Sequence, residues 1–281
     1  MVEKTQRKWL ALALLATVQF MVILDIAIVN VALPSIQTDL GFSQENLQWV
    51  ISAYALFFGG FLLLGGRAAD LLGRRRLFIV GLIVFSASSL LSGFAWSEES
   101  LIVARAIQGF GAAIITPAAL SILMTTFSEG RDRNAALGVW GGVGAFGAVA
   151  GVLLGGILTD AFSWEWIFYI NVPVGLAALA LTPLLLTESR DAHVKTFDAL
   201  GAVLVTAGLV TLVFAIAQAN EYGWTSAATI GLFTSAGALL AGFVGWELRA
   251  KEPLVPFSIF RVKTLTAANI SGLILGTVTF S

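Results

Sequence analysis

The chain has 281 residues, of which 58% are hydrophobic and 12% are charged, and its formal net charge is −1. Ordinary soluble domains carry about 25% charged residues, so this composition excludes a soluble domain of the usual kind. The charge balance also excludes the basic surface that nucleic-acid binding needs. The absence of cysteine excludes disulfides, thiolate metal sites and cysteine nucleophiles. His193, the single histidine, is expected to be a solvated loop residue, and neither a metal nor a cofactor is expected.

Apolar stretches long enough to cross a bilayer recur along the whole sequence. About 20 helical residues span the hydrocarbon core, and a helix satisfies every backbone polar group within it. The stretches lack the alternating pattern of a transmembrane β-barrel. We therefore expect an all-α polytopic membrane protein with nine transmembrane segments, at residues 9–33, 47–66, 77–95, 101–127, 135–158, 166–186, 199–219, 226–246 and 264–281.

Basic residues predict the orientation of these segments. Fifteen of the sixteen Lys and Arg residues precede the first segment or follow an even-numbered one, and the remaining one, Arg105, lies inside the fourth. The opposite loops carry acidic residues and neither Lys nor Arg. Because positively charged loops stay in the cytoplasm, the N-terminus is predicted to be cytoplasmic. Tryptophans agree, since only Trp140 lies well inside a segment and the other seven lie at segment ends.

Asp25 and Arg105 are the two ionisable residues within segments. At 1.5 Å per helical residue, both lie in the outer half of the membrane at depths that differ by roughly 6 Å, so contact is possible. Charges inside a membrane mark pathways or pairs. Two interpretations remain open, a structural ion pair or a protonation site coupled to conformation. Burial and a neighbouring arginine act in opposite directions on a carboxylate, and a coupling group needs such tuning.

Other polar or aromatic residues within the segments are candidates for lining a substrate cavity. Asn30, Tyr54 and Gln108 offer hydrogen-bonding groups, and Trp140 offers a large ring. Each is individually weak evidence for a ligand site. Pro117, inside the fourth segment, removes a backbone hydrogen bond and is expected to bend that helix.

The short connection from Gly66 to Leu77 combines one acid with four arginines and two glycines. It is either a topology anchor with a tight turn, or a charge-based latch between helix ends. The latch residues would be Gly66, Asp70, Gly73, Arg74 and Arg75.

The fifth segment is rich in glycine, and it resembles the second. Gly147, Gly151 and Gly155 recur every four residues on one face, with Gly156 beside them. Such spacing lets helix backbones approach closely, either for packing alone or as a sliding contact. The pair Gly155-Gly156 also matches Gly65-Gly66 at an offset of ninety residues. An aspartate and a phenylalanine follow each pair at the same distances. Segments 1–3 and 4–6 therefore read as an inverted repeat, a construction principle of secondary transporters.

These motifs resemble the major facilitator superfamily, and within it the fourteen-span drug:proton antiporters. The resemblance covers essentially the whole chain and rests on residues 24–34, 66–77, 105–109, 147–156 and 164–175, the last with Asn171-Val172-Pro173. It implies a six-helix N-terminal bundle at 1–186 and a short cytoplasmic loop at 187–198. It also implies two extra linking helices at 199–246, and a loop with the first helix of a second bundle at 247–281. By analogy, five spans of the second half are missing, so the chain is expected to be truncated.

The resemblance implies proton-coupled efflux of drugs or metabolites by alternating access, with Asp25 and Arg105 in proton coupling. The expected partners are amphipathic drug-like molecules, protons and the lipid bilayer of a bacterial plasma membrane. Uptake or facilitated movement of a small solute remains an alternative, as does a non-transporting scaffold or sensor. An enzyme is disfavoured because the chain lacks clustered His, Asp or Glu near a membrane surface.

Overall fold

The computed structural model describes residues 2–190, 198–250 and 253–280, and all regular structure within them is helical. His193 lies outside the described residues. Two long helices, α1 (Val2–Leu40) and α6 (Arg131–Ala161), accompany shorter ones. The others are α2 (Gln44–Leu47), α3 (Trp49–Leu72), α4 (Arg74–Gly93), α5 (Glu98–Thr126), α7 (Trp166–Tyr169), α8 (Asn171–Leu185), α9 (Ala199–Tyr222), α10 (Ala227–Glu247), the 3₁₀ helix η1 (Phe257–Arg261) and α11 (Lys263–Phe280).

Eight helical segments of the described chain are long and apolar enough to cross a membrane, and they correspond to the first eight predicted spans. Several of these helices, such as the first and the fifth, run past the predicted apolar cores, because a helix continues into the polar interface where composition no longer marks it. The ninth predicted span forms α11, which is not among those eight. That α11 crosses the membrane therefore stays a prediction.

The sixth predicted span forms one membrane-length helical stretch, Trp166–Leu185, whose hydrogen-bond pattern is interrupted at Ile170. Ile170 keeps helical backbone angles, with φ −59° and ψ −28°, between the short helix α7 and the longer helix α8. Pro173 has no N–H to donate to the carbonyl of Tyr169 four residues earlier, which accounts for the interruption. The division matters because the next residue, Asn171, is buried inside the bundle.

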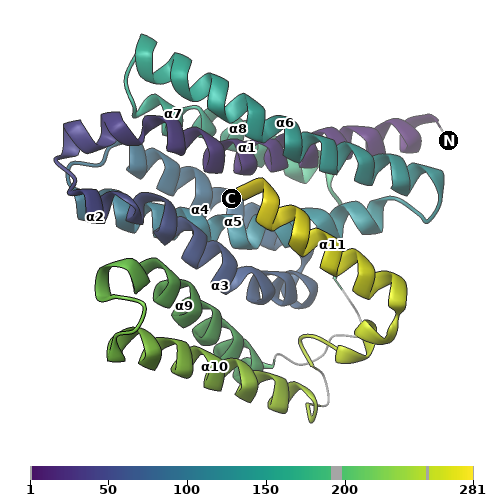
Figure 1. Cartoon of the computed structure of the whole chain (residues 1–281). Coiled ribbons are helices and arrows are strands. Elements are labelled where there is room, and N and C mark those ends of the chain that lie inside the picture. Colours follow the sequence, from purple (N-terminus) through teal and green to yellow (C-terminus); the bar gives the residue numbers. More distant parts are fainter. Residues whose placement is uncertain (1, 191–197, 251–252, 281) are drawn as a thin grey trace.

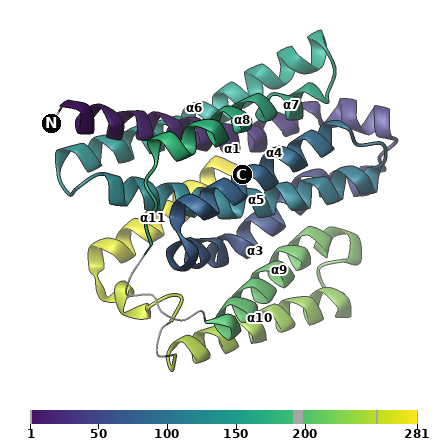
Figure 2. The ribbon, with the colours of Figure 1, turned by 180° about the vertical axis from the view of Figure 1, so that it is seen from behind.

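Helices from the first six spans form one bundle in which α1 packs on α6, and α5 packs on both α3 and α4 (Figure 1). α8 lies against α4 and α1. Seen from behind, α4 and α5 run side by side along the bundle (Figure 2). The α9–α10 hairpin stands outside this bundle and contacts it through α9 on α3.

Two glycines related by the sequence repeat lie at close helix approaches. A Cβ at Gly65 of α3 would collide with the backbone of Ala113 in α5. A Cβ at Gly155 of α6 would lie 3.0 Å from the carbonyl oxygen of Ile28 in α1. Corresponding glycines therefore pack the second span of each repeat against the first span of the other, which is the exchange that an inverted repeat predicts.

The buried side chains fall into two apolar clusters that α1 joins. Residues of α1 up to Val22 belong to one cluster, with Phe78 and Phe85 of α4. Residues from Leu24 onward belong to the other, with Phe168 of α7. Asp25 lies at the junction, so the fold places a buried carboxylate between two apolar clusters.

Candidate functional site

Asp25 and Arg105 are in direct contact inside the bundle. Arg105 Nη1 donates to Asp25 Oδ2 at 2.6 Å, and the two side chains are 1% and 0% exposed. The depth difference expected from sequence is covered by the length of the arginine side chain. A charge-assisted bond of this length is among the strong ones, and its burial removes competition from water.

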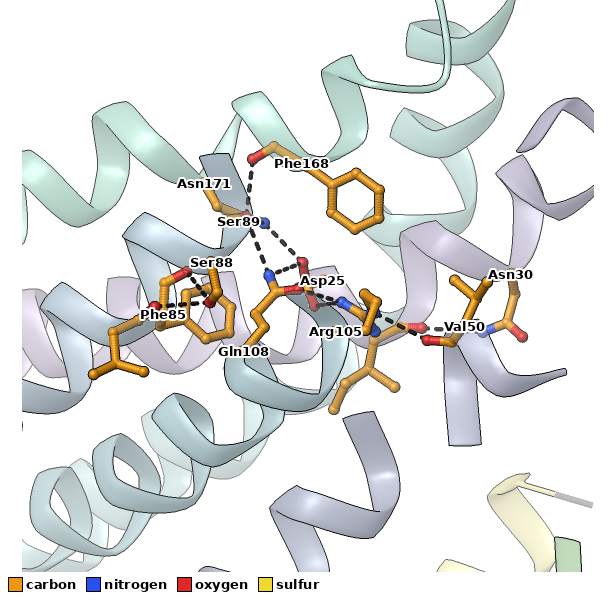
Figure 3. Close-up of polar contacts among 12 residues, drawn as sticks. Asp25, Asn30, Val50, Phe85, Ser88, Ser89, Arg105, Gln108, Phe168 and Asn171 are labelled. Atoms are coloured by element: carbon orange, nitrogen blue, oxygen red, sulfur yellow. Dashed lines mark hydrogen bonds and ion pairs between the residues drawn. The ribbon is translucent and has the colours of Figure 1, made fainter. Parts of the chain in front are cut away.

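Two amides and a serine complete the surroundings of the carboxylate (Figure 3). Gln108 Nε2 donates to Asp25 Oδ1 at 2.8 Å and to Ser89 Oγ at 3.1 Å. Asn171 Nδ2 makes the same two contacts at 2.8 and 3.0 Å. Ser89 Oγ donates in turn to the carbonyl oxygen of Phe168 at 3.0 Å. These groups come from α4, α5, α7 and α8 and converge on one side chain of α1.

Arg105 is fixed by further contacts, including one with the Phe168 ring, whose centroid lies 5.6 Å from the guanidinium carbon. Its Nη1 also donates to Gln108 Oε1 at 2.6 Å, and its Nε donates to the carbonyl oxygen of Val50 at 3.0 Å. The guanidinium carbon lies 4.4 Å from the centroid of the Tyr54 ring, which favours a cation. Gly109 makes this geometry possible, because a Cβ there would collide with the Tyr54 carbonyl.

The arrangement can hold a carboxylate in its ionised form or take up one proton. Asp25 accepts three donated hydrogen bonds, two on Oδ1 and one on Oδ2. Oδ2 therefore keeps a free lone pair, and a proton bound there removes the negative charge that Arg105 Nη1 contacts. Among the described residues, no group of three or more His, Cys, Asp or Glu side chains gathers in a way that would hold a metal ion.

The remaining cavity candidates lie apart from any shared opening. Tyr54 and Gln108 are 3% and 0% exposed, so both belong to the buried network. Asn30 is exposed on α1 and donates to the carbonyl oxygen of Ile26 in its own helix. Trp140 is half-buried against the apolar cluster that contains Val22. The structure thus brings two of the four candidates together, and their role in a substrate cavity stays a prediction.

The predicted latch lies at the opposite end of α3 from the carboxylate. Arg74 Nε and Nη2 donate to Asp70 Oδ1 at 2.9 and 2.8 Å, and Ser121 Oγ of α5 donates to the same oxygen at 3.4 Å. Gly73 ends α3 with a φ of 114°, which a residue with a Cβ rarely adopts. A Cβ at Gly66 would make an ordinary contact with Pro117, and α5 continues as a helix through that proline.

Glu188 is a latch partner that the sequence reading missed. Its carboxylate accepts the backbone N–H groups of Arg75 and Arg76 at 3.1 and 3.2 Å, at the N-terminus of α4. Both arginine side chains also lie within ion-pair distance, at 3.9 and 3.8 Å. The carboxylate therefore joins the end of the sixth span to the start of the third. The sequence offered one signal for this contact, an acidic residue close after an apolar segment.

Three of the four predicted packing glycines face α1. A Cβ at Gly147 or Gly151 would approach Ile23 or Ala27 at 3.3 and 2.6 Å, and Gly155 contacts the next turn of α1. Gly156 faces open space in this chain. The stripe is thus a helix-packing contact within the bundle.

Ser89 and Asn171 are the site residues that the sequence reading did not select. Ser89 is about six residues from the outer end of its predicted span, and Asn171 about five from the outer end of the sixth. Both depths match those of Asp25 and Arg105. Polar residues at a common depth in different spans were a usable signal.

Comparisons with known proteins agree with this architecture. The profile of the Major Facilitator Superfamily matches residues 15–281. The puromycin resistance protein pur8 of Streptomyces alboniger is 44% identical over 89% of the chain and 50% of its own length. The cephamycin export protein CmcT of Amycolatopsis lactamdurans is 43% identical over 98% of the chain and 57% of its own length. The chain thus spans about half the length of the curated relatives it matches.

Solved structures support the fold independently of sequence identity. A peptide transporter POT in complex with sulfate superposes with a TM-score of 0.63 at 17% identity, covering 86% of this chain and 53% of that one. The human organic anion transporter MFSD10 gives 0.58 at 15% identity, covering 75% and 56%. Matched across nearly its whole length and sharing this helical bundle, the chain belongs to the Major Facilitator Superfamily.

Proposed function

We propose that the protein containing this chain exports amphipathic drug-like molecules or metabolites across a bacterial plasma membrane, in exchange for protons. The observation that carries the proposal is the buried Asp25–Arg105 pair, a titratable group held between two apolar layers. The names of relatives add support, since several are described as resistance or export proteins for antibiotics. Uptake of a solute is the competing outcome.

The proton acts by removing the charge that the donors around Asp25 contact. Protonation of Asp25 on the free lone pair of Oδ2 removes its negative charge and so weakens the bond from Arg105 Nη1. Arg105 keeps Gln108 Oε1, the Val50 carbonyl and the face of the Tyr54 ring. The guanidinium therefore has partners in both states, while the charge-assisted link between α1 and α5 is present only in the ionised state. That difference lets proton binding bias one conformation over another.

The proposal extends to the whole protein. We place the N-terminus in the cytoplasm, because basic residues gather at that end of the bundle. We expect fourteen spans, with α9 and α10 linking two six-helix bundles that alternate access around a midplane site. In this scheme the latch residues Gly66, Asp70, Gly73, Arg74 and Arg75 hold the cytoplasmic ends of α3 and α4 in one conformation.

Proton-driven accumulation of a fluorescent amphipathic cation in inverted membrane vesicles, where export runs into the lumen, tests the function. Asp25→Asn removes the titratable group but keeps the shape of the side chain. We expect it to abolish the response of transport to a pH gradient. Asp160→Asn, which alters an exposed aspartate at the end of α6, should leave that response intact. Export that persists in Asp25→Asn and still follows the pH gradient would refute the proposal.

A further inference from the structure

The division of the sixth span lies directly beside the buried carboxylate. Asn171 is the first residue of α8, and Phe168 belongs to α7 on the other side of Ile170. Both contact the Asp25 network, Asn171 through its amide and Phe168 through its backbone carbonyl. Asn171 is thus bonded to the carboxylate directly, whereas α7 is connected to it through Ser89 and the two amides.

The chemistry of the acceptors fixes the orientation of Asn171. An ionised carboxylate can only accept, so the amide nitrogen of Asn171 must face Asp25. Its Oδ1 is buried and has no hydrogen-bond partner among the described residues. The hydrogen bonds that position this side chain are thus those to Asp25 and Ser89.

Ser89 carries the link onward to α7. Its hydroxyl hydrogen goes to the Phe168 carbonyl, which leaves its oxygen to accept from Gln108 and Asn171. Beyond this contact, α7 is fastened to α4 by Tyr169, whose hydroxyl donates to the Gly93 carbonyl at 2.6 Å. The carboxylate, the two amides, the serine and α7 therefore form one continuous chain of contacts.

We propose that Asn171 and Ser89 are positioning residues that couple the protonation of Asp25 to the α7–α8 junction. The proposal rests on the proposed function, in which Asp25 binds and releases a proton. Hydrogen bonds to an ionised carboxylate are about twice as strong as those between neutral groups. Proton binding therefore weakens the hold of Asp25 on Asn171 and releases the junction. Loss of the proton restores that hold.

The absence of cysteine makes the junction easy to monitor. The variant Ser163→Cys introduces a thiol in the turn before α7, and this thiol is the single one among these 281 residues. Its reaction rate with a hydrophilic maleimide is measured across a range of pH in the purified full-length protein. Division by the rate of Ser128→Cys, at the opposite end of the bundle, removes the intrinsic pH dependence of the thiol reaction. This readout requires no transport.

We expect the normalised rate to change with pH around a single midpoint, and Asp25→Asn to abolish that change. Asn171→Ala removes a donor to the ionised form and should move the midpoint upward by about one pH unit. Ser89→Ala should move it less, in the same direction. Should Asn171→Ala fail to fold, the isosteric Asn171→Asp replaces the donor with an acceptor and should move the midpoint further.

Matched controls separate the coupling from general destabilisation. Ser88, the buried neighbour of Ser89, donates only to carbonyls of its own helix, so Ser88→Ala should leave the midpoint unchanged. Asn220→Ala, at the exposed end of α9, should do the same. The proposed coupling would be overturned if the midpoint were unchanged in Asn171→Ala, or if it shifted equally in Ser88→Ala. If the midpoint shifts as expected but vesicles show no proton-driven export, the coupling stands and the proposed function fails.

Discussion

Arg105 shows how much one side chain can depend on its neighbours. Its guanidinium contacts an ionised carboxylate, an amide oxygen, a backbone carbonyl and an aromatic face at once. The planar fork of arginine reaches these partners from one position, and a lysine, with a compact charge, cannot. The contacts with Asp25 are therefore specific to arginine as well as to positive charge.

Removing the arginine alone should be worse than removing both charges. Arg105→Ala leaves Asp25 buried without its cation, and breaking a buried pair in this way costs about 3–5 kcal/mol. The double variant Asp25→Asn/Arg105→Ala has no unpaired charge and should recover part of that loss. Thermal unfolding of the purified variants checks this, and a double variant no more stable than Arg105→Ala would contradict it.

The sequence predicted the charged residues of the site, Asp25 and Arg105, but not its neutral residues Ser89 and Asn171. Asp25 and Arg105 were visible because a charge within an apolar segment is rare. Ser89 and Asn171 were not, since serine is common in membrane helices and asparagine resembled part of a family motif. Their depth agreed with that of the charges, but which face of each helix they occupy depends on packing that no single segment encodes.

At the scale of helices, positions related by the sequence repeat make corresponding contacts between helices. The sequence analysis selected Gly155 for packing but singled out Gly66 in the first pair, whereas the structure gives the close approach to the first glycine of each pair, Gly65 and Gly155. Pairs of glycines look equivalent in sequence, and only the helix rotation decides which one faces its neighbour. The interruption in the sixth span was likewise not predicted, although Pro173 was a signal for it in the sequence.

Adjacent glycines in α3 provide a matched test of this packing. Gly65→Ala places a methyl group against the backbone of Ala113, which cannot yield as a side chain could. Overpacking of this kind costs about 1–3 kcal/mol. Gly66→Ala adds the same methyl at an ordinary contact distance of 3.4 Å from Pro117 and should unfold close to the unmodified temperature. Equal unfolding temperatures for the two variants would show that α3 and α5 do not pack as described.

At the scale of the whole molecule, the eight confirmed spans followed from length and hydropathy alone. Orientation followed from a charge asymmetry that packing does not influence, so it stays a prediction. The α9–α10 hairpin illustrates the limit of such reasoning. Its helices were predicted, but their attachment to α3 rests on particular contacts such as Trp49 against Phe214, with ring centroids 5.7 Å apart.

The same introduced cysteines can test the orientation in intact cells. Ser163→Cys lies at the end of the bundle predicted to face outward, and Ser128→Cys at the end predicted to face the cytoplasm. A maleimide that cannot cross the membrane should label the first and spare the second until the cells are opened. Labelling of Ser128→Cys in intact cells would invert the proposed topology.

The burial of Asp25 between two apolar clusters has a consequence for the proton gradient across the membrane. In the conformation described, neither oxygen of the carboxylate is open to water, since the side chain is 0% exposed. A proton can then reach or leave the site only when the bundle rearranges. An exporter built in this way would not leak protons while idle, so the membrane gradient would be drawn down only in proportion to the work performed.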